Sequence, residues 1–416
     1  MEKSFQVKSY LKGKSDLLIL VLITLSTFFQ FIPLFIGPLR YTFYLPLVTF
    51  LLIIFLQFIK YIPFEYKKEY NLAYFLFSLW LFYGCITVFW SYNQSIAIIN
   101  LYYRFVYLLI FYSLTQFINT KSRILFFNRM IWFLLLFNVL VAFWEMLSLH
   151  HFPTSKRYQY LSFTPTGAFY NENSFAAVLM LCTPFLFYDY KKYYKIISDV
   201  LIVVVFIIFA AQGARLALLM YFPVMLYYIY KRTSLIFKIS IFTIIIFSTL
   251  LLIHKFPAVG FIFNRHINNH VFSFGKEIES PLLGSMDVRK ELYTLSVMNA
   301  IETRGFGKGI GNFERSISHA KKKTFSKDNN PHSLFFEITN SEGLISLISL
   351  SLIVFLPLFY MIRNDKLNNR MKFFIFWLVI YFTFSNFLPG NIRSIYLYWT
   401  VLSFVYVLSL SNENIS

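Results

Sequence analysis

The sequence consists largely of apolar runs of about 20 residues that recur along its whole length. One such run is long enough to cross the hydrocarbon core of a bilayer as a single helix. Charged residues make up only 14% of the chain, against about 25% in an average soluble domain, and the mean hydropathy is +0.60. The runs are continuous and do not alternate in polarity, which argues against a transmembrane β-barrel. The sequence therefore predicts an all-α fold, a polytopic bundle of membrane helices.

About twelve transmembrane helices are predicted from these runs. They lie near residues 16–37, 41–59, 72–91, 96–117, 129–148, 172–188, 195–212, 214–230, 235–254, 342–361, 371–388 and 394–411. About nine fall in 1–254 and about three in 333–416, separated by a long loop over 255–332, and the whole is expected to form one integral membrane domain. The basic N-terminus shows no small-residue cleavage site, so the first helix is expected to be retained rather than removed as a signal.

The distribution of Lys and Arg predicts how the bundle is oriented. The net charge of +19 comes from short basic clusters between apolar runs, a pattern that orients membrane proteins and does not indicate nucleic-acid binding. Every second loop is rich in basic residues, namely Lys60, Lys67, Lys68, Lys121, Arg123, Arg129, Lys191, Lys192, Lys195, Lys231, Arg232, Lys238, Arg363, Lys366, Arg370 and Lys372. Both termini are therefore predicted to be cytoplasmic, and the long loop extracytoplasmic.

The long outward loop contains the largest polar segment of the chain. An amphipathic helix is predicted over 288–301, and we expect it to lie at the membrane surface. Its apolar residues at helical spacing are Leu292, Leu295, Met298 and Ile301. The run GFGKGIG follows at 305–311 and matches neither the dinucleotide fingerprint nor a P-loop. Its glycines are interpreted as a flexible turn.

Three ionisable residues beside the spans are candidates for catalysis, because charge near a membrane is costly and often functional. Arg215 stands in a very short outward hairpin, as either an interfacial residue or a bidentate ligand of a lipid diphosphate. Arg289 opens the amphipathic helix, as either a solvated surface charge or part of the same site. His332 stands at the start of a span, as either a helix-start residue or a general base for a sugar hydroxyl.

Two further charged residues belong to predicted spans. Arg104 lies inside one and needs a partner or a water-filled cavity, but the sequence does not identify that partner. Glu342, together with Glu337, follows His332 within about three helical turns and is a candidate to orient it or to bind sugar. The histidines lack the spacing of ligands, so no metal site is predicted. The two cysteines lie in apolar runs and are interpreted as packing residues.

Four short motifs follow one another between the middle and the end of the chain. The first is TGAFYNENSFAAVLMLCTPF at 166–185, which has the form Gly-x-x-x-Asn-x-Asn before a span. Gly167, Asn171 and Asn173 match this form, whereas Glu172 stands where proline is usual.

The other three motifs occupy residues 212–219, 288–313 and 331–347. QGARLALL is similar to Ser-Arg-x-x-x-Leu, with Arg215 kept and alanine in place of the serine. VRKELYTLSVMNAIETRGFGKGIGNF is similar to Arg-x-x-x-Trp followed by Gly-x-Gly-x-Gly-x-Phe, with Tyr293 near the usual tryptophan. PHSLFFEITNSEGLISL is similar to His-Asn-x-x-Leu before Gly-Leu, with Ser333 in place of the asparagine. Together, the motifs resemble the O-antigen ligase and polymerase superfamily of bacterial membrane glycosyltransferases.

The resemblance implies metal-independent transfer of a glycan from undecaprenyl diphosphate to an acceptor sugar, without a cofactor, at the outer face of the bacterial cytoplasmic membrane. By motif, Arg215 and Arg289 hold the diphosphate leaving group, and His332 activates or positions the acceptor hydroxyl. Other expected substrate-binding residues are Asn171, Asn173, Glu342 and Arg104. The expected partners are the undecaprenyl-diphosphate-linked glycan, a glycan or lipid-linked acceptor, membrane lipids and other polysaccharide assembly proteins.

Two choices stay open. Within the superfamily, the enzyme is either a polymerase that adds a growing chain to a lipid-linked repeat unit, or a ligase that moves a finished O-antigen or capsule-type chain to a surface acceptor. The basic outer loop of moderate size favours the polymerase. From another class, a multi-span transporter or flippase of lipid-linked glycans also needs about twelve helices and a few intramembrane charges, but the sequence shows no internal repeat of the kind such proteins often carry.

Overall fold

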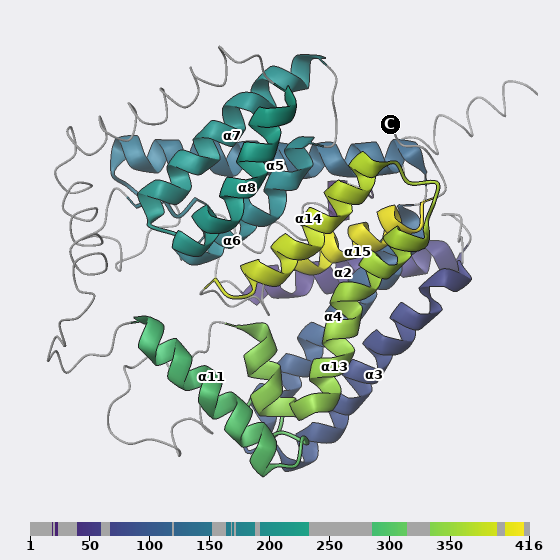
Figure 1. Cartoon of the computed structure of the whole chain (residues 1–416). Helices are drawn as coiled ribbons and strands as arrows, with labels where there is room; N and C mark the ends of the chain where they lie inside the picture. The colour runs from purple at the N-terminus through teal and green to yellow at the C-terminus, as the bar shows by residue number, and fades with distance from the viewer. Residues whose placement is uncertain are drawn as a thin grey trace, which may run out of the picture.

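The computed structural model describes residues 19, 21–23, 40–59, 67–118, 120–151, 164–167, 169, 172–187, 192–232, 285–313, 333–388 and 396–411. All regular secondary structure in these residues is helical (Figure 1). The α-helices are α2 (Arg40–Phe58), α3 (Asn71–Thr87), α4 (Gln94–Phe117), α5 (Lys121–Ser148), α6 (Glu172–Cys182), α7 (Lys192–Gln212), α8 (Arg215–Arg232), α11 (Ser285–Glu302), α13 (Leu334–Arg363), α14 (Asn369–Ser385) and α15 (Tyr396–Ser409). Short 3₁₀ helices are η1 (Lys68–Tyr70), η2 (Val88–Trp90) and η4 (Thr183–Phe187).

The chain is a multi-pass membrane protein. Among the described residues, 4 helices are long and apolar enough to cross a membrane, namely Lys68–Trp90, Gln94–Phe117, Lys121–Ser148 and Leu334–Arg363. Shorter apolar helices coincide with most of the other predicted spans. The predicted spans near 16–37 and 235–254 lie mostly or wholly outside the described residues, as do 255–284 and 314–332 of the predicted loop.

The helices form two groups joined by α14 and α15 (Figure 1). In Figure 1, α5, α6, α7 and α8 lie in the upper half, and α3, α4, α11 and the broken helix α13 lie in the lower half. Between them, α15 packs against α4, α6 and α13, and α14 packs against α6, α8 and α13. Aromatic rings fill the junction, where Trp399 stacks on Tyr107 with 4.2 Å between ring centroids.

Hydrogen bonds join the segments that connect the helices to one another at the ends of the bundle. At one end, Tyr360 Oη donates to the carbonyl oxygen of Glu69 at 2.8 Å, and Asn364 Nδ2 donates to that of Ser411 at 2.9 Å. Elsewhere, Trp90 Nε1 donates to the carbonyl oxygen of Gly307 at 3.2 Å, which joins the connection before α4 to the run 305–311. Each of these bonds joins segments that the alternation of basic loops predicts on the same side of the membrane.

Helix α13 is broken at Gly343, and the segment 305–311, called the glycine loop from here on, completes the break. Gly343 has φ 73° and ψ −158°. In an unbroken helix, the N–H of Leu344 would bond to the carbonyl of Asn340. Instead, the Leu344 N–H donates to the carbonyl of Gly305 at 2.8 Å, and the Asn340 carbonyl accepts from the N–H of Lys308 at 2.9 Å. The glycine loop therefore satisfies backbone groups that the break leaves without helical partners.

The glycine loop is held on its other side by α3, η2 and the start of α4. Tyr83 Oη donates to the carbonyl of Phe306 at 3.1 Å, and Ser91 Oγ donates to that of Ile310 at 2.7 Å. The run contains turns, as the sequence predicts, but its backbone is held by hydrogen bonds on both sides rather than free. Its glycines have positive φ angles and lie against neighbouring backbone, so glycine is needed for close approach. A Cβ on Gly307 would stand 2.5 Å from the backbone nitrogen of Gly343.

Helix α11 extends the predicted amphipathic helix by a few residues and turns a different face to the protein. Leu292 is buried, but Met298 is 50% exposed and Ile301 71% exposed. The buried face continues instead through Ser296 and Asn299. Asn299 on this face hydrogen-bonds to Asn340 of α13, whereas Ser296 donates to the carbonyl of Leu292 in its own helix. Met298 and Ile301 lie on the outside, where a lipid interface can cover them.

Substitution of Gly343 by alanine is expected to destabilise the protein. The observed φ and ψ lie in a region that only glycine tolerates well, at a cost of about 1–3 kcal/mol for other residues, and the new Cβ would overlap the carbonyl of Gly305. Thermal unfolding of the purified protein in detergent measures the loss. The matched control is Ile345→Ala, two residues on and 39% exposed, which should melt near the wild type. Equal melting temperatures for both variants would contradict the role given to Gly343.

Candidate functional site

Arg289 lies on α11, four residues before Tyr293. It is half-buried, and this burial lowers the pKa of its guanidinium, an effect partly offset by the nearby Tyr293. The group nevertheless stays charged at neutral pH, because arginine starts from so high a pKa. The ring of Tyr293 stacks on Phe336 with 4.0 Å between centroids and 9° between planes. Arg289 thus belongs to a helix that is packed against the first turn of α13.

The structure does not describe the side chains of His332 and Arg215, so only the residues next to them in the sequence locate them. His332 lies outside the described residues; it directly precedes Ser333, which is buried next to the start of α13. Arg215 is the first residue of α8, and its side chain lies outside the described part. The prediction that Arg215, Arg289 and His332 share one site therefore stays a prediction.

Arg104 and Glu342 form a buried ion pair inside the bundle. Arg104 Nη2 contacts Glu342 Oε1, and the two side chains are 5% and 2% exposed. This gives Arg104 the partner that the sequence requires but does not identify. The guanidinium also lies 4.6 Å from the centroid of the Trp80 ring, and its Nη1 donates to the Trp80 carbonyl at 3.2 Å. The pair thereby joins α3, α4 and α13.

The space around Arg104 is closely filled. A Cβ on Gly84 would overlap Nη1 of Arg104 and stand 3.0 Å from a methyl carbon of Leu101. Within the described residues, Oε2 of Glu342 is buried without a hydrogen-bond partner. A charged pair of this kind is stable in a membrane only while both partners are present, since one left alone would be an uncompensated buried charge.

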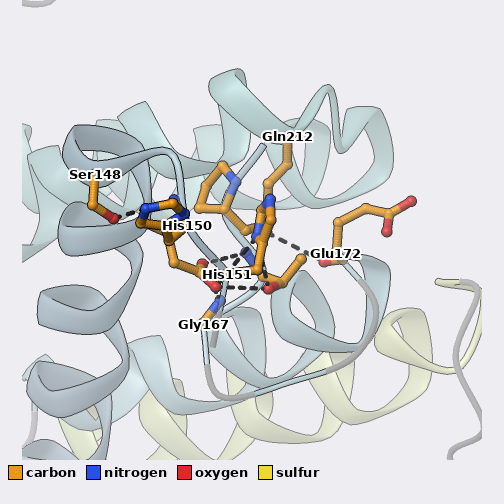
Figure 2. A network of polar contacts seen from close by, with 9 residues as sticks. Ser148, His150, His151, Gly167, Glu172 and Gln212 are labelled. Atoms are coloured by element: carbon orange, nitrogen blue, oxygen red, sulfur yellow. Dashed lines mark hydrogen bonds and ion pairs between the residues drawn. The ribbon is translucent and has the colours of Figure 1, made fainter. Parts of the chain in front are cut away.

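Glu145 is the centre of a second buried network, to which His151 and Gly167, labelled in Figure 2, belong. Its carboxylate is 0% exposed and accepts from the N–H of Thr166 at 2.6 Å, from Thr166 Oγ1 at 2.8 Å and from the N–H of Gly167 at 2.8 Å. His151 Nδ1 lies 3.4 Å from Glu145 Oε1. Sequence reasoning missed Glu145, although a carboxylate inside an apolar span is itself a signal of function or pairing.

This network connects the first two motifs. Gln212, at the end of α7, donates through Nε2 to the carbonyl of Pro165 at 2.8 Å and to that of Glu172 at 3.2 Å, as Figure 2 shows. Asn173 Nδ2 donates to Glu172 Oε1 at 3.3 Å, whereas Asn171 lies outside the described residues. The hairpin that leads to Arg215 is therefore attached to the segment that contains the asparagine motif.

The third and fourth motifs are joined in the same way. Asn299 Nδ2 donates to Asn340 Oδ1 at 2.6 Å, and the N–H of Gly309 donates to the carbonyl of Ser341 at 2.7 Å. The first motif is thus hydrogen-bonded to the second, and the third to the fourth. Groups of three or more His, Cys, Asp or Glu suited to a metal ion do not occur within the described ranges.

Comparison with known proteins finds a distant relative. No family model matches the chain. The chain is 23% identical over 339 residues to the teichuronic acid biosynthesis protein TuaE of Bacillus subtilis (strain 168), and the alignment covers 76% of this chain and 67% of that protein. The aligned length makes this chain a distant homologue of that protein.

Replacement of Glu145 by glutamine is expected to lower the stability of the protein by about 1–3 kcal/mol, because an amide NH₂ would face donors where the carboxylate now accepts. Thermal unfolding in detergent checks this. The control is Glu69→Gln, at an exposed carboxylate, which should leave the melting temperature unchanged. A Glu145→Gln protein that melts with the wild type would show that the network contributes little.

Proposed function

We propose that this protein is a membrane glycosyltransferase that transfers a glycan from undecaprenyl diphosphate to an acceptor sugar during the assembly of an envelope polysaccharide. The observation that carries the proposal is the homology to TuaE over 76% of the chain, because that protein is named for the synthesis of teichuronic acid, a cell-wall polysaccharide. The four motifs of the superfamily, which the fold joins in two pairs, support the same activity.

The proposed orientation puts both termini in the cytoplasm and the site at the outer face of the bacterial cytoplasmic membrane. The alternation of basic loops supports it. So does the packing of the glycine loop against Trp90 and Ser91, since the sequence assigns both segments to the outer side. The exposed aromatic residues at this end, Phe89, Trp90 and Tyr92, are of the kind that collects at membrane interfaces.

In the proposed reaction, the acceptor hydroxyl attacks the anomeric carbon of the donor glycan. The bond between this carbon and the diphosphate oxygen breaks, undecaprenyl diphosphate leaves, and the hydroxyl proton passes to a base. Arg215 and Arg289 hold the diphosphate and stabilise the charge that develops on it. A half-buried guanidinium such as that of Arg289 does this better than a fully solvated one, because electrostatic stabilisation is stronger in a poorly solvated site.

His332 is proposed to accept the hydroxyl proton or to position the hydroxyl, as a group with a pKa near neutrality can. Asn171 and Asn173 are proposed to bind sugar. Asn173 fits this role because its side chain is part of the network at Glu172 and is not fully buried.

We favour a polymerase over a ligase. The relative is named for the synthesis of a polysaccharide, and a lipopolysaccharide acceptor has no support in that name. The choice is tested by profiling surface glycan in a deletion strain. Loss of a polymerase leaves single repeat units at the surface, and loss of a ligase leaves full-length chains on undecaprenyl diphosphate. Accumulation of lipid-linked units on the cytoplasmic side would instead identify a flippase and contradict the proposal.

The alanine variants of Arg215, Arg289 and His332 should each reduce surface polymer by about 100-fold or more, the scale seen when a group that stabilises developing charge is removed. The protein should still reach the membrane at wild-type levels. Polymer length and amount are measured on gels of extracted glycan, with membrane abundance measured by immunoblot.

The matched control is Lys290→Ala, which removes an exposed positive charge directly beside Arg289 and should leave polymer unchanged. Equal loss in Lys290→Ala and Arg289→Ala would mean that the effect is one of general surface charge. Wild-type polymer in all three site variants would refute the proposed function.

A further inference from the structure

We infer that Arg104 and Glu342 are positioning residues: their ion pair fixes the break in α13 at Gly343, and the glycine loop bound to that break sets the position of α11 and hence of Arg289. The inference rests on the proposed function, in which Arg289 holds the diphosphate. It replaces the substrate-binding role expected for Arg104 and Glu342 from the sequence.

The ion pair determines where the break lies relative to the rest of the bundle. Glu342 is the last residue before Gly343, and its carboxylate is bound by Arg104 of α4. Arg104 is itself held by the Trp80 carbonyl and ring. The end of the first segment of α13 is therefore tied to α3 and α4 through one side chain that has little space to move.

The glycine loop connects the break in α13 to α11, so the position of the break constrains that of α11. It begins only a few residues after the end of α11 and bonds to both sides of the break, at Asn340 and Ser341 before it and at Leu344 after it. The helix α11 is also joined directly to the first segment of α13, through Asn299 and Asn340. A shift of Glu342 would thus carry the glycine loop and α11 with it.

Direct binding of a diphosphate by the pair is disfavoured. Both side chains are buried, at 5% and 2% exposed, and they contact one another. A diphosphate at Arg104 would have to displace Glu342 or stand beside its carboxylate, where like charges repel. Arg289, which is half-buried at the edge of the bundle, is better placed for a lipid-linked anion.

The test uses the full-length protein in detergent and compares two ion pairs next to the same loop. Arg104→Met with Glu342→Leu replaces the buried pair by apolar groups of similar size, a change that proteins often tolerate in stability. Glu302→Ala with Lys308→Ala removes the exposed pair, in which Lys308 Nζ lies 2.8 Å from Glu302 Oε2. Exposed pairs contribute little, so this control should behave as the wild type in every measurement.

The first measurement needs no ligand. Spin labels at Met298→Cys on α11 and Ile348→Cys after the break, both exposed, report the distance between α11 and the second segment of α13; exposed Cys85 is replaced by serine. The second measurement is the affinity for undecaprenyl diphosphate, with Arg289→Ala as a reference for loss of binding.

We expect the apolar double variant to melt near the wild type, to show a shifted or broadened distance distribution, and to bind undecaprenyl diphosphate about 10-fold more weakly, within the range by which residues remote from a ligand alter its binding. An unchanged distance overturns the inference, as does a changed distance with wild-type affinity when Arg289→Ala itself loses binding. If the double variant does not fold, Arg104→Lys takes its place. It keeps the charge but loses the planar fork, and wild-type distance and affinity in it would equally overturn the inference.

If the proposed function is wrong, the binding measurements differ from those that would overturn the role of the ion pair. If the wild type does not bind undecaprenyl diphosphate, or if Arg289→Ala binds it unchanged, the diphosphate site is wrong, while a changed distance in the double variant still supports the control of α11 by the ion pair.

Discussion

The break in α13 at Gly343 is the feature on which the lower half of the structure depends. A helix interrupted within a membrane bundle leaves N–H and carbonyl groups that water does not reach, and each must find a partner inside the protein. The partners come from the glycine loop, whose own backbone is bonded in turn to Tyr83, Trp90 and Ser91. The requirement to satisfy these few groups joins α3, α4, α11 and α13 in one arrangement.

Buried charge acts beside this backbone requirement. Arg104 and Glu342 neutralise one another at the break, and the Glu145 carboxylate accepts hydrogen bonds from two backbone N–H groups and a hydroxyl. Both arrangements stabilise a buried carboxylate: Glu342 is paired with a cation from another helix, and Glu145 is bound by the segment that precedes α6. In both, the carboxylate joins one of the four sequence motifs to a neighbouring helix.

The sequence predicted much of this architecture and little of the site's interior. Apolar runs predicted the helices, since a length of about 20 residues has one dominant use in a bilayer. Periodicity located α11 but did not show which of its residues pack against α13, because the buried Asn299 is held there by a hydrogen bond to Asn340 that hydrophobicity does not register. The glycines were taken for a flexible turn because glycine has the same sequence signature whether it permits motion or permits close packing.

What the sequence determined by itself is the helices that the structure describes in the apolar runs, the alternation of charge between those runs and the motifs that resemble a glycosyltransferase superfamily. These depend on composition and on short-range order. Only the tertiary structure decided that Arg104 pairs with Glu342, that Glu145 binds the segment at Thr166 and Gly167, and that the glycine loop completes α13. Those contacts join residues far apart in the chain. Their existence follows from where buried charges and unsatisfied backbone groups meet once the helices have packed.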